Sequence, residues 1–341
     1  MTKKIIMKIA FFELEGWENK VLQENFPKDE LFLSKDKLES LNVPLQKDFE
    51  VVCVFVNSVL NKEVLSQFPN LKFITTRSTG FDHIDITYCK ERGIKVAYVP
   101  NYGMNTVAEY AFSLLLNLTR KTYQAIDRIK ENGDFSLAGL RGMDIKGKTL
   151  GVIGMGKIGK ESAKIAQGFG MNVIAFDAYP DAKAAAEMGF QYVSLEDLLK
   201  SSDIISIHAV YNPSTHHLIN ENNFQLIKKG AYLVNTARGA IVQTETLIVA
   251  LKKGILAGYA TDVLEDEGEV KDELNYLTQT RLKEDVVKNM LYDHILMEMP
   301  NVLITPHNAF NTEEALQRIL NTTVENIKGF ESGGEFIEVK L

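Results

Sequence analysis

At 341 residues the chain is long for a single domain, and with 45% hydrophobic and 24% charged residues it has an ordinary globular composition, so we expect two domains, each with its own core. The formal net charge of −7 argues against nucleic acid or an anionic membrane surface as the main partner but leaves anionic small molecules open. No run approaches the roughly 18 uncharged apolar residues that a membrane-spanning helix needs, so no membrane partner is expected.

The first apolar stretch is interrupted by Lys8 and followed by Glu13, which favours an opening strand over a signal peptide. The only cysteines are Cys53, inside an apolar run, and Cys89. Two isolated thiols make no disulfide framework, so a reducing compartment, the cytoplasm, is expected.

Residues 1–100 alternate short apolar runs with segments of helical pattern, which predicts parallel strands joined by helices. The helices are expected at Gly16–Phe26, Lys62–Phe68 and Ile86–Arg92. The expected strands are Ile5–Phe12, Leu31–Leu33, Val51–Val56, Leu71–Thr75 and Ile94–Val99.

A long helical pattern starts near Asn105, where apolar residues recur at spacings of three and four from Val107 to Leu118. It fits a plain amphipathic helix, a helix at a dimer interface, or a link between two domains. A homodimer is the expected oligomeric state.

From Thr149 the alternation of strands and helices restarts, whereas Glu265–Met299 is charged, helical in pattern and longer than a usual connection. That stretch is expected to be an insertion between the last two strands. The expected strands are Thr149–Ile153, Asn172–Phe176, Ile204–His208, Ala231–Asn235, Gly258–Thr261 and Val302–Thr305.

A Gly-x-Gly-x-x-Gly motif, Gly154 to Gly159, stands between the expected strand at Thr149–Ile153 and a helical pattern. In this context Gly154 permits a tight turn, Gly156 lets the backbone approach a pyrophosphate, and Gly159 allows close packing of helix and strand. Asp177 ends the next strand, 23 residues after Gly154, where a carboxylate accepts ribose hydroxyls. Because no arginine follows it closely, NAD is favoured over NADP as the cofactor.

Three polar side chains follow expected strands at the edge where doubly wound sheets bind ligands: Arg238, Glu267 and His307. Reduction of a 2-keto acid needs a cation for the carboxylate and carbonyl, a hydride from nicotinamide, and an acid for the developing alkoxide. Each residue also has a plainer interpretation, namely a surface ion pair, a solvated acidic face or a structural histidine. The remaining histidines show no metal-ligand spacing, so no metal is expected.

The motifs from Leu150 to His307, and more loosely the chain from Val51 to Arg318, resemble the D-isomer-specific 2-hydroxyacid dehydrogenase family. The resemblance implies that Arg238 clamps the substrate carboxylate and keto oxygen, His307 donates the proton, and Glu267 orients the imidazole and favours its charged form. It also implies cofactor contacts by Gly154, Gly156, Lys157, Ile158, Gly159, Asp177, Ala209, Val210, Thr236, Ala237 and Asp262.

The same resemblance implies further substrate contacts. Arg77–Asp82 resembles the family's carboxylate-binding turn, with the N–H groups of Thr79 and Gly80 facing the substrate. Tyr102 and the insertion after Glu267 resemble the D-lactate dehydrogenase branch, so pyruvate is the leading substrate. Phe310 is expected at the substrate side chain.

The chain departs from the family in two places. Ala209 and Val210 stand where Val-Pro is usual, which implies a different backbone near the cofactor. Asn311 stands where lactate-specific members tend to have a second aromatic residue after Phe310, which implies a different side-chain pocket.

The expected fold is α/β, with two doubly wound parallel-sheet lobes and substrate bound in a cleft between them. Residues 104–305 are expected to form a Rossmann NAD-binding domain inserted into a flavodoxin-like substrate domain made of residues 1–103 and 306–341. Rival interpretations are the same reaction on glyoxylate, hydroxypyruvate, 3-phosphoglycerate or a branched 2-keto acid, and a non-catalytic NAD-sensing corepressor.

Overall fold

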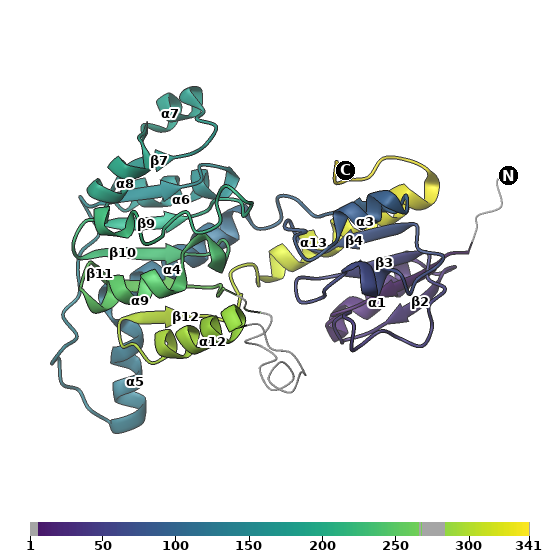
Figure 1. The fold of residues 1–341 in the computed structure, drawn as a ribbon, viewed down its shortest axis with the longest axis horizontal. Coiled ribbons are helices and arrows are strands. Elements are labelled where there is room, and N and C mark those ends of the chain that lie inside the picture. Colours follow the sequence, from purple (N-terminus) through teal and green to yellow (C-terminus); the bar gives the residue numbers. More distant parts are fainter. Residues whose placement is uncertain (1–5, 266, 268–283, 341) are drawn as a thin grey trace. The chain divides into compact units, whose positions relative to one another are not determined.

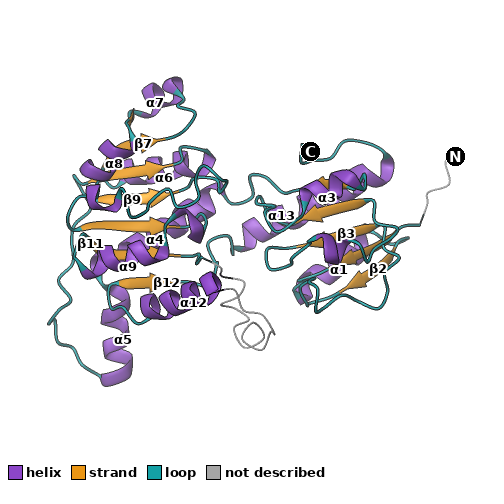
Figure 2. Cartoon of the chain, in the orientation of Figure 1, coloured by secondary structure: helices purple, strands orange, loops and turns teal. Residues whose placement is uncertain are grey.

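The chain folds into two units in the computed structural model, which describes residues 6–265, 267 and 284–340. One unit comprises Met1–Tyr102 and Thr312–Leu341, and the other Gly103–Asn311. Each is built around a parallel sheet with helices on both faces, which confirms the expected fold class (Figure 2). The second segment of the first unit is the α-helix α13 (Glu313–Ser332) and the residues that follow it.

The first unit contains a five-stranded sheet of order β2-β1-β3-β4-β5, the flavodoxin-like arrangement. All pairings are parallel. Its strands are β1 (Lys8–Phe11), β2 (Glu30–Leu33), β3 (Val51–Val54), β4 (Phe73–Thr76) and β5 (Lys95–Ala97). The helices between them are α1 (Gly16–Asn25), α2 (Lys62–Leu65) and α3 (Ile86–Glu91).

Both faces of this first sheet are buried because successive side chains of a strand point to opposite faces. In β1, Ile9 and Phe11 pack in the core beneath α1 and α13, whereas Ala10 packs on the other side, beneath α2 and α3. The continuous apolar runs read from the sequence are therefore strands buried on both sides.

The second unit contains a seven-stranded sheet of order β12-β11-β10-β9-β6-β7-β8 (Figure 1). Every pairing is parallel. The strands are β6 (Thr149–Ile153), β7 (Asn172–Phe176), β8 (Gln191–Tyr192), β9 (Ile204–Ile207), β10 (Ala231–Asn235), β11 (Leu256–Thr261) and β12 (Val302–Ile304).

Helices cover both faces of this second sheet. One face packs against α4 (Met104–Arg120) and α6 (Lys157–Gly168), and the other against α8 (Leu195–Ser201) and α9 (Thr244–Lys252). The remaining helices are α5 (Thr122–Asn132), α7 (Ala182–Met188) and α12 (Glu284–Met297), and two short 3₁₀ turns span Phe224–Leu226 and Gly239–Ile241.

The helical pattern from Asn105 onward forms two helices. Lys121 adopts a left-handed conformation with φ of 53°, which ends α4 and starts α5 in a new direction. Of the expected insertion at Glu265–Met299, α12 lies between β11 and β12, while residues 266 and 268–283 are outside the described residues. Residue 5, at the start of the first expected strand, is outside them as well.

The order of the strands in the second unit reverses between β6 and β9, and ligands of doubly wound sheets bind outside the carboxyl ends at such a switch point. The segments that follow β6, β7, β9, β10, β11 and β12 on this edge contain most of the expected site residues of the unit. His307 also belongs here, although residues from 306 on were expected in the other lobe. Backbone hydrogen bonds of His307, Asn308 and Ala309 to Asp262 hold this turn in the second unit.

Candidate active site

The glycine-rich loop between β6 and α6 has a separate physical reason for each glycine. Gly154 has φ of +91°, and a Cβ there would lie 2.5 Å from the backbone nitrogen of Ala209. A Cβ on Gly159 would lie 2.2 Å from the carbonyl oxygen of Gly154. Gly156 differs, because its Cβ would meet nothing within 4 Å among the described residues.

Gly156 is also the N-cap of α6 and has no side chain to cap the first N–H groups of that helix. Open space in front of uncapped N–H groups at a helix N-terminus fits a pyrophosphate. Lys157 and Ile158 occupy the first helical turn beside it.

Asp177 lies next to this loop, as the ribose role requires. One carboxylate oxygen accepts the N–H of Met155 at 2.7 Å, and the other accepts the N–H of Tyr179 at 2.8 Å. The carboxylate is therefore fixed at the end of β7 and retains lone pairs for ribose hydroxyls.

The segment after β9 forms the other side of the switch point. The His208 imidazole is enclosed, with Nε2 within 2.9 Å of the hydroxyls of Ser162 and Ser206. Burial lowers its pKa to about 4, so it is neutral at physiological pH. Ala209 abuts Gly154, and Val210 is 80% exposed, which leaves an apolar side chain at the surface beside the loop.

Thr236 and Ala237 follow β10. The Ala237 N–H donates to Oδ1 of Asn235 at 3.0 Å. The hydroxyl oxygen of Thr236 is buried and has no hydrogen-bond partner within the described part of the chain. A buried polar atom without a partner is costly, so this hydroxyl fits a contact with the nicotinamide end of the cofactor.

Asp262 is 1% exposed at the end of β11, and its carboxylate holds the turn that contains His307. It accepts the hydroxyl of Thr305 at 2.6 Å and the N–H groups of Asn308 and Ala309 at 2.8 and 2.7 Å. Burial raises the pKa of the carboxyl in spite of these donors. The sequence motif gave no sign of this internal clamp.

His307 adopts a left-handed conformation with φ of 55°, which is uncommon for a residue with a Cβ. Its Nδ1 lies 2.6 Å from a carboxylate oxygen of Glu267, and both side chains are partly buried, with 16% and 29% exposed. The carboxylate selects the tautomer or cation with a proton on Nδ1, which leaves Nε2 directed elsewhere to exchange a proton. The ring of Phe310 lies 6.4 Å from the imidazole, centroid to centroid.

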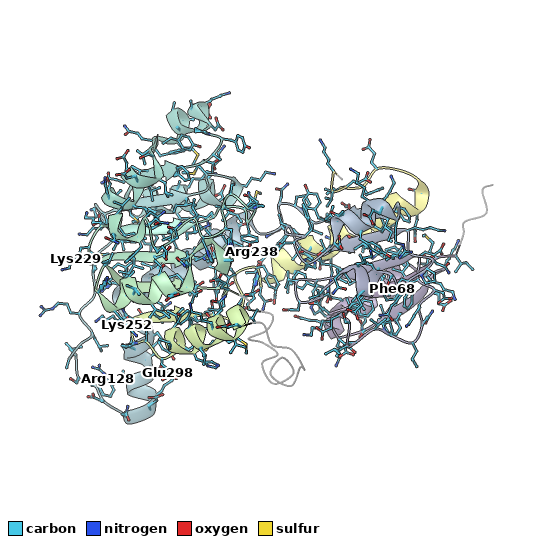
Figure 3. All side chains as sticks on the ribbon, viewed as in Figure 1. Phe68, Arg128, Lys229, Arg238, Lys252 and Glu298 are labelled. Atoms are coloured by element: carbon cyan, nitrogen blue, oxygen red, sulfur yellow. The ribbon has the colours of Figure 1, made fainter. Side chains whose placement is uncertain are left out.

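Arg238 follows β10 and lies at the carboxyl edge of the sheet (Figure 3). The Asn235 side chain donates to the Arg238 carbonyl at 2.9 Å, and one guanidinium nitrogen donates to the Ala237 carbonyl at 2.8 Å. Gly239 packs against the backbone of Leu264, where a Cβ would lie 2.0 Å from the carbonyl carbon. The backbone that follows Arg238 is thereby held against Leu264 and Glu265.

The expected substrate residues of the first unit, Thr79, Gly80 and Tyr102, make hydrogen bonds within that unit. The Thr79 hydroxyl donates to the Val99 carbonyl at 2.9 Å. The Ser78 hydroxyl donates to the Gly80 carbonyl at 2.6 Å, and the Tyr102 carbonyl accepts from Arg318 at 2.7 Å. A buried ion pair between Arg77 and Glu18 ties this turn to α1.

The structure thus brings Glu267 and His307 together, sets Gly239, the residue after Arg238, against Leu264 and Glu265, and places Asp177 against the glycine loop. Sequence reasoning missed the Asp262 clamp and a second pair, His217 with Glu265, 2.7 Å apart. Both join residues far apart in sequence, and no local pattern marks them.

Within the described residues, no helix is long and apolar enough to cross a membrane, and no group of three or more His, Cys, Asp or Glu could hold a metal ion. Cys53 and Cys89 are buried free thiols, and burial raises their pKa values to about 12 and about 11.

Comparison with known proteins gives a consistent result. Residues 112–309 match the family model for the D-isomer specific 2-hydroxyacid dehydrogenase, NAD binding domain. A 2-hydroxyacid dehydrogenase homolog of Zymomonas mobilis is 39% identical over 335 residues, which cover 96% of this chain and 98% of that protein. The D-lactate dehydrogenase of Escherichia coli is 38% identical over 334 residues, which cover 96% and 98%.

Among solved structures, the D-lactate dehydrogenase from Aquifex aeolicus complexed with NAD and lactic acid matches with a TM-score of 0.83. It is 37% identical, and the match covers 95% of this chain and 96% of that one. The switch-point geometry, the glycine loop and these matches confirm the expected resemblance and the cofactor, NAD. The chain belongs to the D-isomer-specific 2-hydroxyacid dehydrogenase family of NAD-dependent oxidoreductases.

Proposed function

We propose that the protein reduces a small 2-keto acid to its D-2-hydroxy acid with NADH, and that pyruvate and D-lactate are the physiological pair. The observation that carries the proposal is the 2.6 Å contact between His307 Nδ1 and Glu267, on the same sheet edge as the glycine loop. A histidine held by a carboxylate through one nitrogen can give a proton from the other.

In this proposal His307 donates a proton from Nε2 to the oxygen of the keto group during reduction and accepts it during oxidation. Glu267 fixes the ring orientation and stabilises the imidazolium. NADH, when bound, supplies the hydride. The left-handed backbone at residue 307 directs the ring, and the Asp262 clamp maintains that backbone against its strain.

Arg238 binds the substrate carboxylate and polarises the keto oxygen, because its planar guanidinium presents paired donors to both. The first unit is assigned to substrate binding, through the N–H groups of Thr79 and Gly80 and through Tyr102. Phe310, close to His307, is assigned to the substrate side chain.

The second unit is assigned to cofactor binding. Gly154, Gly156, Lys157, Ile158 and Gly159 receive the pyrophosphate, and Asp177 receives the adenosine ribose. Ala209 and Val210 line the adenosine side, while Thr236, Ala237 and Asp262 lie at the nicotinamide end. For Asp262 the contact has to use lone pairs that the three internal donors leave free.

Pyruvate is proposed as the substrate because relatives of similar length are named D-lactate dehydrogenases. Phe310 is followed by Asn311, whereas lactate-specific members tend to have two aromatic residues there. The side-chain pocket is therefore weaker support for pyruvate than the aromatic pair would be. Glyoxylate, hydroxypyruvate and branched 2-keto acids therefore remain alternatives.

A homodimer is proposed from the apolar surface of α5 and the residues after it. None of the residues of α5, all of them described, is buried. Tyr123, Ile126 and Ile129 are 53%, 46% and 44% exposed, and Phe135 and Leu137 are 79% and 83% exposed. Light scattering should give twice the monomer mass, and a monomer at micromolar concentration would contradict this.

A cytoplasmic location is proposed because the two free thiols fit a reducing compartment.

The test of the activity is a screen of NADH oxidation against pyruvate, glyoxylate, hydroxypyruvate, phenylpyruvate and 2-ketoisocaproate. We expect the highest kcat/KM with pyruvate and a D-configured product. Faster turnover of another keto acid would correct the substrate. NADH binding without turnover of any keto acid would refute the enzymatic proposal and favour an NAD-sensing role.

A further inference from the structure

A second histidine–glutamate pair, His217 and Glu265, lies beside the turn that follows Arg238. Glu265 follows β11, is 9% exposed, and accepts hydrogen bonds from two separate segments. One carboxylate oxygen lies 2.7 Å from Nε2 of His217. The other accepts the hydroxyl of Thr244 at 2.7 Å and its N–H at 3.4 Å. The Glu265 carboxylate therefore joins the loop after β9 to the first turn of α9.

The His217 segment is itself fixed against the turn that follows Arg238. The His217 N–H donates to the Ala240 carbonyl at 2.8 Å, and the Ile219 N–H donates to the Ile241 carbonyl at 3.2 Å. His217 adopts φ of 48°, and the ring of His216 stacks on its imidazole at 3.8 Å. His217 thus contacts Glu265 through its ring and Ala240 through its backbone.

Gly239 completes the enclosure, because it approaches Leu264 and Glu265 so closely that a Cβ would lie 2.3 Å from the Glu265 nitrogen. The turn at residues 239–241 is held on one side by residues 264–265 and on another by residues 217–219. Arg238 is the residue immediately before this turn, so the contacts that hold the turn also fix the backbone from which its side chain extends.

We infer that His217 and Glu265 are positioning residues for Arg238, and that their hydrogen bond sets the affinity of the protein for the carboxylate of a 2-keto acid. The inference rests on the proposed function. His217 is given no part in proton transfer, because its Nε2 is already hydrogen-bonded to Glu265. The physical basis of the inference is that small displacements of a charged clamp weaken ligand binding steeply.

The experiment measures the Kd of oxamate, an isostere of pyruvate, for the NADH-bound protein, together with the Kd of NADH and the melting temperature. His217→Ala and Glu265→Ala should raise the oxamate Kd and the pyruvate KM by about tenfold to a hundredfold, with the NADH Kd within about twofold of wild type. Glu265→Gln keeps an acceptor for Thr244 and a partner for His217, and it should restore most of the affinity.

Milder variants keep the test valid if the alanine variants fail to fold. Thr244→Val removes the hydroxyl donor and should raise the oxamate Kd, whereas Thr244→Ser retains it and should not. Thr246→Val is the matched control, because Thr246 lies in the same helical turn but bonds to Gln243 and not to Glu265.

A double-mutant cycle separates positioning from general destabilisation. If His217 acts through Arg238, adding His217→Ala to Arg238→Lys should raise the oxamate Kd little further. Two results would overturn the inference: fold increases in the oxamate Kd that multiply in the double variant, or an oxamate Kd that is unchanged in His217→Ala and Thr244→Val. If the wild type still reduces pyruvate, the proposed function remains intact. A wild type that neither binds oxamate nor reduces a keto acid would remove both.

Discussion

Acid should destabilise the second unit through His208, whose imidazole is enclosed beside the glycine loop. Burial lowers its pKa from 6.5 to about 4, and its hydrogen-bond partners, the hydroxyls of Ser162 and Ser206, carry no charge. The unfolded chain therefore takes up a proton before the folded one as the pH falls. The contribution of His208 to the free energy of unfolding is fully present above the pKa of the imidazole in the unfolded chain. It is lost as the pH falls toward the pKa of the imidazole in the folded protein.

The size of this loss of stability follows from the difference between the pKa values of His208 in the unfolded and folded states. A difference of about 2.5 units at about 1.36 kcal/mol per unit gives about 3 kcal/mol in all. Linkage places about 2 kcal/mol of that loss between about pH 8 and pH 5. This is a large part of the stability of an ordinary domain.

The assay compares wild type with His208→Asn in urea titrations at pH 8 and pH 5, followed by far-ultraviolet circular dichroism. The variant should be less stable at pH 8 but should lose about 2 kcal/mol less on acidification, since the other titrating groups are shared. Trp17, the only tryptophan, lies in the first unit, so its fluorescence reports that unit and should show the same acid loss in both proteins. Equal losses of stability in the two proteins, measured by circular dichroism, would show that His208 is not the source of the acid sensitivity.

Three further predictions concern the site. Gly156→Val should keep the melting temperature but weaken NADH binding by at least about tenfold, since its side chain enters the open space before α6, and unchanged NADH titrations would contradict that location. Asp262→Asn should cost about 1–3 kcal/mol in urea unfolding and lower kcat, because one backbone donor of the His307 turn loses its acceptor. A kcat equal to wild type would exclude the clamp. Asp177→Ser should shift the kcat/KM ratio of NADH to NADPH toward NADPH, and a constant ratio would argue against the ribose contact.

The Rossmann unit could be predicted from the sequence because its signals are local. The strands β6, β7 and β10 have the predicted bounds, and the glycine motif with Asp177 stands where strand and helix periodicity place it. Strand ends are harder to predict, as at β5, whose ladder with β4 spans Lys95–Ala97 within the expected strand Ile94–Val99.

Features that depend on distant contacts or on single backbone angles could not be predicted. The two-residue β8 is too short to show a pattern, and the break at Lys121 depends on a left-handed residue that composition does not mark. The unit boundary lies after Asn311, beyond the expected position, because Asp262 anchors the His307 turn. His217 has its partner 48 residues away, so no local sequence pattern marks the pair.

The role of His307 as proton donor is tested by the kcat/KM of His307→Gln for pyruvate reduction at saturating NADH. We expect the kcat/KM to fall by about a hundredfold or more, with the affinity for NADH retained. A kcat/KM within a few-fold of wild type would contradict it.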